Sequence, residues 1–399
     1  MPARIPLAMA SVQSGVTPSA VEGVDLPPIE NIGWTLGNDC PYRCPHCYST
    51  IVRNRGRNLE IADVDRIVGQ LKSIGVRTVN LGGNEPIFTS GPNPKDTILP
   101  YIIQSLHGAG IVAGLTTAGI TLTYLERMFP DSVALINDTD VSLDSPFAYE
   151  HDKNRGAALF DHAMKAIAIL RRRGIDRTII MCGMKWNLSD EHIDALIKLA
   201  KEQETFIRIN FMKPIEPHHM ELVPDAATFY RASRRLMEEC KVIELGEPLG
   251  STMFGGTSRG CPCGTKSFRI HSITPDGRVP VSPCVYAHDY KVGDLLKDEL
   301  VDIIASPQFM AFRNRRRNPA SITECNGCEY LQQCRGGCAS RAYLWSRFKL
   351  KNVPVEAARD PYCLRDFGSG LLSPPPTMVK QDIVLVHRDY LCTLIVDPS

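Results

Sequence analysis

The chain has 399 residues, of which 43% are apolar and 22% are charged, a composition typical of a globular protein with one large domain and a smaller one, or two comparable ones. Lysine and arginine total 45 and aspartate and glutamate total 44, so we expect neither nucleic acid nor an anionic membrane surface as a partner. The N-terminus lacks a secretory signal, and no apolar run approaches the roughly 18 residues of a membrane span, which predicts a cytoplasmic protein.

Most of the first 245 residues repeat a pattern of strand and helix. Residues 1–28 are rich in Pro, Ser and Gly without periodicity, which predicts a flexible N-terminal arm. The expected strands cover 29–37, 77–83, 111–119, 140–144, 177–184 and 206–212, and the best-defined helices begin near 61, 97, 158 and 226. Such alternation implies parallel strands joined by right-handed helical crossovers. We therefore predict an α/β fold, a partial (βα)6 TIM-like barrel over residues 29–245.

A second domain is predicted from a change of composition. After about residue 245 the helical periodicity ends, and residues 246–367 are rich in Gly, Cys, Pro and Arg. We assign them to a C-terminal cysteine-rich auxiliary domain. Residues 368–399 hold a stiff Ser-Pro-Pro-Pro linker and the β-prone run 382–396, a tail that can add a strand to a sheet or dock a partner.

Cysteine is the most informative residue type in this chain. There are 14 cysteines, and in a reducing compartment clustered cysteines usually bind metal or act in catalysis. Cys40, Cys44 and Cys47 form a C-x3-C-x2-C triplet directly after the first expected strand. Three thiolates on one loop can hold three irons of a cubane and leave the fourth iron open to another ligand. The alternative is a structural zinc site completed by His46, although zinc ligands usually come as two separate Cys-x2-Cys pairs.

This triplet, at the end of the first strand of a βα series, resembles the radical S-adenosylmethionine (SAM) superfamily. The resemblance implies that the open iron chelates SAM and that one electron, delivered by an external donor such as flavodoxin or ferredoxin, cleaves it. The products would be methionine and a 5′-deoxyadenosyl radical that abstracts a hydrogen atom from the substrate. The protein would orient the cofactor and exclude water.

Further segments resemble the SAM-binding motifs of that superfamily, namely LGGNEP, VSLDSP and HDKNRG in chain order. By this resemblance the cofactor-binding residues would be Gly82, Gly83, Asn84, Glu85, Ser142, Asp144 and Arg155. Asn84 is inserted before Glu85, so the contact to the SAM amino group stays open among Gly83, Asn84 and Glu85. Without the resemblance, the same segments predict only a turn at the end of a strand, a buried serine and an arginine that caps a helix.

The auxiliary domain holds eight cysteines, enough for two cubanes with four thiolates each. Their spacing resembles the SPASM domain, an auxiliary iron-sulfur module of many radical SAM enzymes. That resemblance implies an outer 4Fe–4S cluster on Cys325, Cys328, Cys334 and Cys363, and an inner one on Cys261, Cys263, Cys284 and Cys338. Together with the first cluster, the enzyme would carry three. Two alternatives stay open: a zinc ribbon, and an inner cluster that uses only one of Cys261 and Cys263 and keeps an open iron.

Three cysteines remain outside these sets. Cys182 lies in an expected strand and Cys240 at a helix end, and both are predicted to pack as small apolar residues. Cys392 lies in the tail. Some peptide epimerases of the superfamily that the chain resembles use a free cysteine as a hydrogen-atom donor, a role for which a tail strand is a poor position.

The sequence defines the substrate less well. Enzymes with SPASM domains act on ribosomally made peptides or on small molecules such as aminoglycosides, and the resemblance favours a peptide that is cross-linked, oxidised or epimerised. Val285 stands where sulfatase-maturing enzymes carry an acidic residue, which argues against that chemistry. Fewer than thirty residues precede the first strand, so no leader-binding domain is expected there, and the arginine-rich run 313–317 is either a solvated face or a contact for an acidic leader peptide. A non-catalytic, zinc-stabilised binding protein is the alternative of another class.

Overall fold

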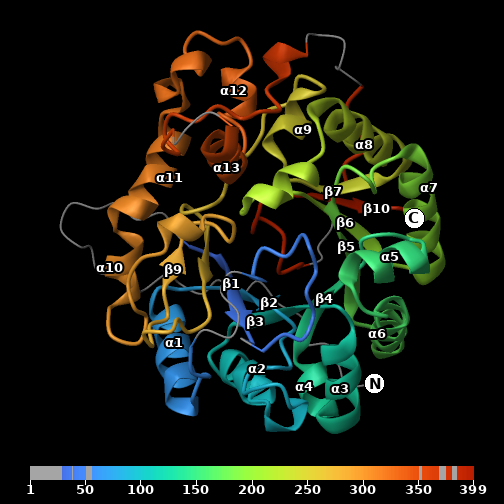
Figure 1. Ribbon diagram of the computed structural model, residues 1–399, viewed down its shortest axis with the longest axis vertical. Coiled ribbons are helices and arrows are strands. Elements are labelled where there is room, and N and C mark those ends of the chain that lie inside the picture. The colour runs from blue at the N-terminus through green and yellow to red at the C-terminus, as the bar shows by residue number, and fades with distance from the viewer. Residues whose placement is uncertain (1–28, 38, 51–55, 350–352, 368–373, 380–383) are drawn as a thin grey trace.

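The computed structural model describes residues 29–37, 39–50, 56–349, 353–367, 374–379 and 384–399 (Figure 1). The N-terminal arm predicted for residues 1–28 lies outside the described residues. Within the described ranges, none of the helices combines the length and the apolar character that crossing a membrane requires. A sheet of ten strands organises the molecule, and helices surround it.

Six parallel strands form the central part of the sheet. They are β1 (Asn31–Leu36), β2 (Thr78–Gly83), β3 (Val112–Thr117), β4 (Ile136–Ser142), β5 (Asp176–Gly183) and β6 (Phe206–Phe211). Each strand pairs with the next one along the chain, so the order in space is the order in sequence. This arrangement confirms the predicted α/β partial barrel.

Helices connect these strands and cover their outer side (Figure 1). They are α1 (Ile61–Ser73), α2 (Leu99–Gly108), α3 (Ile120–Met128), α4 (Pro130–Ala134), α5 (Ala148–Arg155), α6 (Phe160–Arg173), α7 (Asp190–Gln203) and α8 (Ala226–Glu239). Local sequence explains their limits, as where the Ser189 side chain accepts a hydrogen bond from His192 N at the start of α7. The apolar stripe of α1, with Val64 and Leu71 buried, joins the strands in one hydrophobic core.

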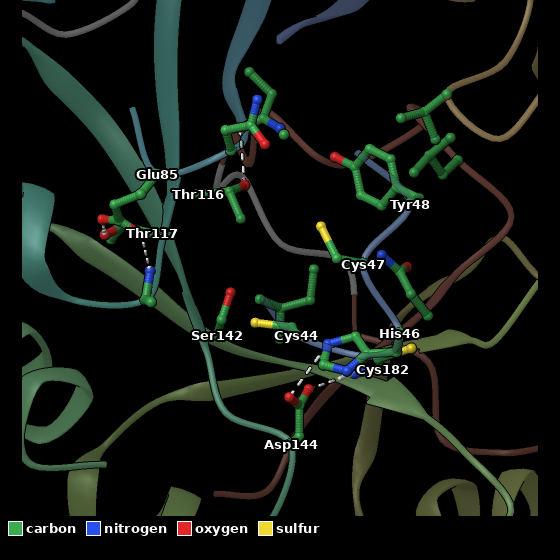
Figure 2. A pocket seen from close by; sticks show the side chains of 18 of the residues that line it. Cys44, His46, Cys47, Tyr48, Glu85, Thr116, Thr117, Ser142, Asp144 and Cys182 are labelled. Atoms are coloured by element: carbon green, nitrogen blue, oxygen red, sulfur yellow. Dashed lines mark hydrogen bonds and ion pairs between the residues drawn. The ribbon is translucent and has the colours of Figure 1, made fainter. Parts of the chain in front are cut away.

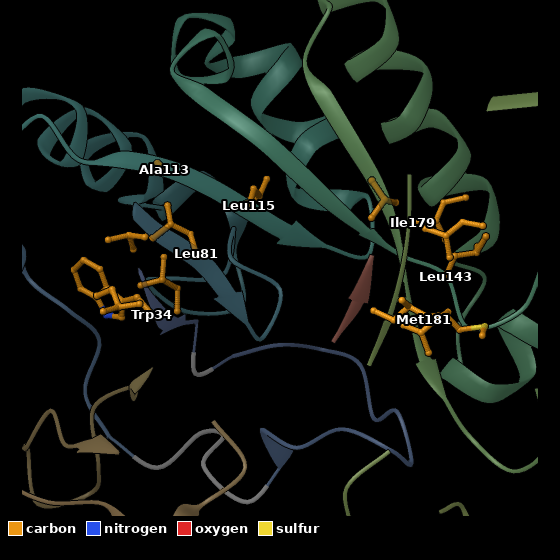
Figure 3. Close-up of a cluster of buried hydrophobic side chains, with 14 of the residues drawn as sticks. Trp34, Leu81, Ala113, Leu115, Leu143, Ile179 and Met181 are labelled. Atoms are coloured by element: carbon orange, nitrogen blue, oxygen red, sulfur yellow. The ribbon is translucent and has the colours of Figure 1, made fainter. Parts of the chain in front are cut away.

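Strand side chains fill that core (Figure 3). Trp34 on β1 lies close to Leu81 on β2, while Ile179 and Met181 on β5 lie in a second group with Leu143. All five side chains are at most 1% exposed. Burying a side chain of this size contributes roughly 1.5–3 kcal/mol, so the strands, and with them the loops at their carboxyl ends, are firmly positioned.

Strand β4 begins earlier than the sequence predicted. A strand was expected only at 140–144, whereas β4 spans Ile136–Ser142. Asp138 and Asp140 are buried within it: Asp138 accepts a hydrogen bond from Val386 N, and Asp140 pairs with Arg208 on β6. Buried carboxylates of this kind interrupt the apolar pattern by which strands are recognised.

The sheet continues beyond the six strands at both edges. β8 (Ser267–Ile270) pairs with β1 in parallel, and β9 (Val281–Ser282) follows β8. At the other edge, β10 (Leu394–Asp397) lies antiparallel between β6 and β7 (Lys241–Leu245). The tail therefore adds a strand to the barrel sheet, one of the two roles predicted for it.

The cysteine-rich part lies beside the barrel and has few regular elements (Figure 1). Its helices are α9 (Pro248–Thr252), α10 (Leu300–Ile304), α11 (Pro307–Arg317), α12 (Leu331–Cys334) and α13 (Ala339–Lys349). Single 3-10 turns occur along the chain at Pro94–Asp96, Pro217–Glu221, His288–Tyr290, Pro319–Ser321, Thr323–Cys325 and Leu364–Asp366. With so little secondary structure, the shape of this part depends on side-chain bonds.

Candidate active site

The first cysteine triplet lies on the loop that follows β1. Cys40 and Cys44 are buried and Cys47 is half-buried. Cys47 N donates to the Cys44 carbonyl at 3.1 Å, and Arg43 Nη1 donates to the Cys40 carbonyl at 2.8 Å, which bends the loop into a compact turn. The loop lies at the carboxyl end of a parallel strand, where the βα loops of barrel enzymes carry their chemistry.

Strand β2 ends in two glycines, the second of which has no room for a side chain. Gly83 has a φ of 95°, and a Cβ there would lie 2.3 Å from Arg269 Nη2 and 2.7 Å from Thr35 Cγ2. Both the left-handed conformation and the close approach require glycine. A Cβ on Gly82 would lie 3.0 Å from Thr116 Cβ. Gly83 lines the cavity described below, whereas Gly82 does not line it.

Glu85 is bonded to the turn that follows β3. Its buried carboxylate accepts hydrogen bonds from the Thr117 hydroxyl, from Ala118 N at 2.8 Å and from Thr121 N at 2.9 Å. These bonds join the β2 loop to the start of α3 (Figure 2). Glu85 therefore positions the backbone of the β2 loop, and backbone groups of that loop are better placed than its carboxylate to meet a cofactor.

Asp144 lies at the centre of a buried charge network. Its carboxylate accepts a hydrogen bond from Arg155 Nε at 2.8 Å and lies 3.4 Å from His46 Nε2 (Figure 2). Asn154 Nδ2 lies 3.1 Å from the same carboxylate and 3.2 Å from His46 Nδ1. Burial acts to raise the pKa of Asp144, but Arg155 and His46 outweigh it and hold that pKa below its ordinary value. The ionised carboxylate thus fixes the triplet loop, through His46, and the end of α5.

The triplet loop, the β2 loop and this network surround one cavity that opens to solvent. Ser142, at the end of β4, also faces it (Figure 2). The predicted cofactor contacts that line the cavity are Gly83, Asn84, Glu85, Ser142, Asp144 and Arg155. A concave site with several converging polar groups is typical of small-molecule and cofactor binding.

The sequence analysis missed the residues that line the cavity from the barrel strands. The polar ones include Asn80 on β2, Thr116 on β3, Arg208 and Asn210 on β6, and Arg269 on β8. Polar residues at every second position of an apolar strand, as on β6, are the signal that could have found them. Cys182, predicted to pack in the core, also lines the cavity, with its Sγ 3.6 Å from Met212 Sδ.

Three tail residues complete the lining: His387, Tyr390 and Leu391. Arg269 Nη1 donates to the Tyr390 hydroxyl at 3.1 Å, and His387 Nδ1 lies 3.2 Å from Asp140 Oδ2. Burial lowers the pKa of His387 to about 3, so its ring is neutral at neutral pH. No local pattern could have predicted these contacts, because Arg269 and Tyr390 are 121 positions apart.

The four cysteines of the predicted outer set come together around α12. Cys325 lies near Cys363 and Cys328, and Cys334 lies near Cys325 and Cys363. Burial raises the pKa of Cys325 and of Cys334 to about 11 each. These thiols therefore stay protonated at neutral pH unless a metal displaces the proton.

The four cysteines of the predicted inner set also come together, and a fifth cysteine joins them. Cys261 interacts with Cys263 and Cys338, and Cys263 interacts with Cys284. Cys392, from the tail, interacts with Cys261 and Cys338. All five side chains are buried. Donor sets made only of sulfur select iron-sulfur clusters or zinc.

The arginine-rich run of α11 is only partly the surface feature that the sequence predicted. Arg313 and Arg315 are buried and cannot present their charges to solvent or to a leader peptide, whereas Arg317 is exposed. Arg315 Nη1 donates to the Val355 carbonyl, and Arg316 Nη1 donates to the Cys261 carbonyl, each at 2.8 Å. The guanidinium groups hold irregular loops around the thiol sets, which suits a planar group with five donors.

Comparison with known proteins agrees with this geometry. A profile of the radical SAM superfamily matches residues 34–200, and a profile of the SPASM iron-sulfur cluster-binding domain matches residues 261–329, which together cover more than half of the chain. The chain belongs to the radical SAM superfamily. Mycofactocin maturase MftC of Mycolicibacterium smegmatis is 25% identical over 379 residues, 91% of this chain and 90% of the relative. PqqA peptide cyclase of Methylobacterium nodulans is 24% identical over 351 residues, 82% of this chain and 84% of the relative.

Solved structures show the same fold. Streptococcus suis SuiB bound to its precursor peptide SuiA aligns with a TM-score of 0.60 at 18% identity, over 84% of this chain and 76% of that chain. Native anSMEcpe with bound AdoMet and Kp18Cys peptide aligns with a TM-score of 0.63 at 14% identity, over 86% of this chain and 95% of that chain. With this coverage, the shared fold extends from the radical SAM barrel into the auxiliary part.

The donor groups of this radical SAM enzyme fit an iron-sulfur cluster that binds SAM. The triplet loop offers three thiols, and His46 turns both of its ring nitrogens toward Asp144 and Asn154. This orientation disfavours a zinc site completed by His46. Three thiols that line one cavity suit a cubane that keeps one iron for another ligand.

Gly83→Ala tests the close approach at the end of β2. The new Cβ would collide with Arg269 and Thr35 in a left-handed conformation, so we expect the free energy of unfolding to fall by about 1–3 kcal/mol and SAM binding to weaken. Gly91→Ala is the matched control, because Gly91 has a φ of 108° but nothing within 4 Å of its Cβ position. Equal SAM affinity in the two variants, measured by equilibrium binding, would count against Gly83 as part of the site.

Proposed function

We propose that this radical SAM enzyme modifies a ribosomally made peptide, by cross-linking, oxidation or epimerisation, after reductive cleavage of SAM. The observation that carries the proposal is one cavity lined both by the cysteine triplet and by Val285 and Leu391, the neighbours of Cys284 and Cys392 in the inner thiol set. Relatives named mycofactocin maturase and PqqA peptide cyclase, and the SuiB structure with its precursor peptide, support a peptide substrate.

We assign three 4Fe–4S clusters to the thiol sets. Cys40, Cys44 and Cys47 would hold the first, Cys325, Cys328, Cys334 and Cys363 the outer, and Cys261, Cys263, Cys284 and Cys338 belong to the inner set. When bound, the first cluster and SAM supply a one-electron cleavage that yields methionine and a 5′-deoxyadenosyl radical. The electron would come from an external donor such as flavodoxin or ferredoxin. We place the protein in a reducing compartment such as the cytoplasm, where clustered cysteines usually bind metal.

The cavity residues divide the work of holding SAM. The backbone of Gly83 and Asn84 would meet the SAM amino group, and Ser142 the ribose or the carboxylate. Arg155 Nε donates its hydrogen bond to Asp144. The two terminal amino groups of the guanidinium are then the donors for a bidentate pair of hydrogen bonds to the SAM carboxylate. Asp144 is thus a positioning residue that acts through Arg155.

Aromatic side chains pack in the same buried cluster as the inner thiol set. The rings of Tyr48 and Tyr286 meet edge to face, with centroids 5.5 Å apart. Lys213 is buried, with Nζ 4.7 Å from the centroid of the Tyr286 ring. Excluding water from this region would protect a radical from side reactions.

Arg155→Lys tests the assigned pair of hydrogen bonds. Lysine keeps the charge but cannot bind Asp144 through Nε and a carboxylate through two terminal groups at once. A hydrogen bond to a charged group contributes about 1.5–3 kcal/mol, so SAM should bind about 10-fold more weakly or worse. Arg57→Lys, in an exposed ion pair with Asp63 on α1, should bind SAM as the wild type does. Unchanged affinity in Arg155→Lys, by equilibrium dialysis, would remove Arg155 from the site.

The substrate class is tested with anaerobically reconstituted enzyme, SAM and dithionite. A short peptide encoded beside the gene should change mass, and the change should require both SAM and dithionite. A variant with all three triplet cysteines replaced by alanine should leave the peptide unchanged. Conversion of a small molecule such as an aminoglycoside, with the peptide untouched, would contradict the peptide assignment.

A further inference from the structure

Cys392 lies among the thiols of the inner set although it comes from the end of the chain. It directly precedes Thr393 and β10, and its side chain is 3% exposed. The C-terminal segment, red in Figure 1, crosses the barrel opening and enters the sheet between β6 and β7. Cys392 packs there in one buried cluster that also contains the four cysteines of the inner set, Cys261, Cys263, Cys284 and Cys338.

The backbone on both sides of Cys392 is held in place. Arg259 Nη2 donates to the Leu391 carbonyl at 2.8 Å, and the Thr393 hydroxyl donates to the Ile209 carbonyl at 3.0 Å. One residue earlier, the Ser267 hydroxyl donates to the Tyr390 carbonyl at 2.7 Å. With its neighbours fixed to the barrel and to β8, Cys392 has little freedom to turn its thiol away from the inner set.

Five buried thiols in one place exceed the four that a cubane needs. Cys261 and Cys263 are separated by a single residue and interact with each other, and each also has partners of its own. Cys263 interacts with Cys284, whereas Cys261 interacts with Cys338 and Cys392. If the inner cluster binds only one of Cys261 and Cys263, then that residue, Cys284 and Cys338 supply three thiolates. The cluster needs a fourth, and the Cys392 thiol lies in the same buried cluster.

We propose that Cys392 supplies the fourth thiolate of the inner cluster, together with Cys284, Cys338 and one member of the Cys261 and Cys263 pair. The proposal rests on the inner cluster assigned under the proposed function. It implies that no iron of this cluster is open to substrate. The inner cluster would then act by electron transfer beside the cavity, and substrate would be held by the side chains that line it.

The test uses the full chain with Cys40, Cys44 and Cys47 replaced by alanine, so that the open iron of the first cluster is removed. In this parent, both auxiliary clusters should be saturated, and cyanide should leave the electron paramagnetic resonance spectrum of the reduced protein unchanged. Adding Cys392→Ala should alter the spectrum and create a species that cyanide shifts. Adding Cys240→Ala instead, which removes a buried cysteine at the end of α8, should leave both readouts as in the parent.

The outcomes separate this proposal from the cluster assignment. A parent with about eight irons, and a Cys392→Ala spectrum identical to that of the parent, would overturn the role of Cys392 alone. A parent without iron in the auxiliary domain would overturn both. If Cys392→Ala does not fold, Cys392→Ser preserves the size of the side chain, and an altered spectrum supports ligation whereas an unchanged one refutes it.

Discussion

Cys40→Ala is expected to abolish the reductive cleavage of SAM. The triplet loop offers three thiols, and the fold supplies no fourth ligand from His46, whose ring nitrogens face Asp144 and Asn154. Losing one of three thiolates leaves too few to hold a cubane with one open iron. Release of 5′-deoxyadenosine in the presence of dithionite should fall to the level of a reaction without enzyme, and iron content should fall by about four per chain.

Cys240→Ala is the control for this variant. Cys240 is also a buried cysteine, but it ends α8 and lies outside the cavity lining. It should keep full iron content and full SAM cleavage. Cleavage of SAM by Cys40→Ala at a rate near that of the wild type would show that the triplet is not the site of the first cluster.

Arg341→Met is expected to cause the largest loss of stability. Arg341, on α13, is fully buried and binds two carboxylates: Glu247 at 2.9 and 3.0 Å, and Asp360 at 2.7 and 2.9 Å. Asp360 also accepts a hydrogen bond from Cys338 N at 2.8 Å, and its carbonyl accepts one from Cys363 N at 3.2 Å. Removing the cation strands two buried carboxylates, which costs roughly 3–5 kcal/mol. Both auxiliary clusters should become labile, since Cys338 and Cys363 depend on Asp360.

Arg347→Met is the matched control on the same helix. Arg347 pairs with Asp289 at the surface, where the two side chains are 37% and 42% exposed, so its loss should cost less than about 1 kcal/mol. Urea unfolding and iron content under mild chelation measure the two effects. Equal urea midpoints for the two variants would refute the stabilising role assigned to the buried cluster of Arg341, Glu247 and Asp360.

The barrel could be predicted because its signals are local. The buried face of α1 repeats along the helix, and apolar residues alternate with polar ones along β6, so the period of the sequence reveals each element. The thiol sets could be predicted because ligand spacing is also local. What the sequence did not reveal depends on contacts between distant residues. The early start of β4 was hidden by Asp138 and Asp140, whose burial makes sense only beside Val386 and Arg208.

The interior of the site was predicted least well, for the same reason. Tyr390 and Cys392 belong to a tail whose place is set by bonds to Ser267, Arg259 and other distant partners. The buried arginines of α11 looked like a surface charge run, since their carbonyl partners lie on loops far along the chain. The barrel strands, loops of the auxiliary part and the C-terminal tail form the cavity together, so no single segment of the sequence predicts it.

The central claim is that the chain cleaves SAM by one-electron reduction at the first cluster. The most direct measurement is the amount of 5′-deoxyadenosine and methionine released by anaerobically reconstituted wild type, with and without dithionite, together with metal content on the same sample. The account predicts both products in equal amounts, only with dithionite, and about twelve irons per chain. Zinc in place of iron, with SAM left intact, would contradict it and favour a zinc-stabilised binding protein.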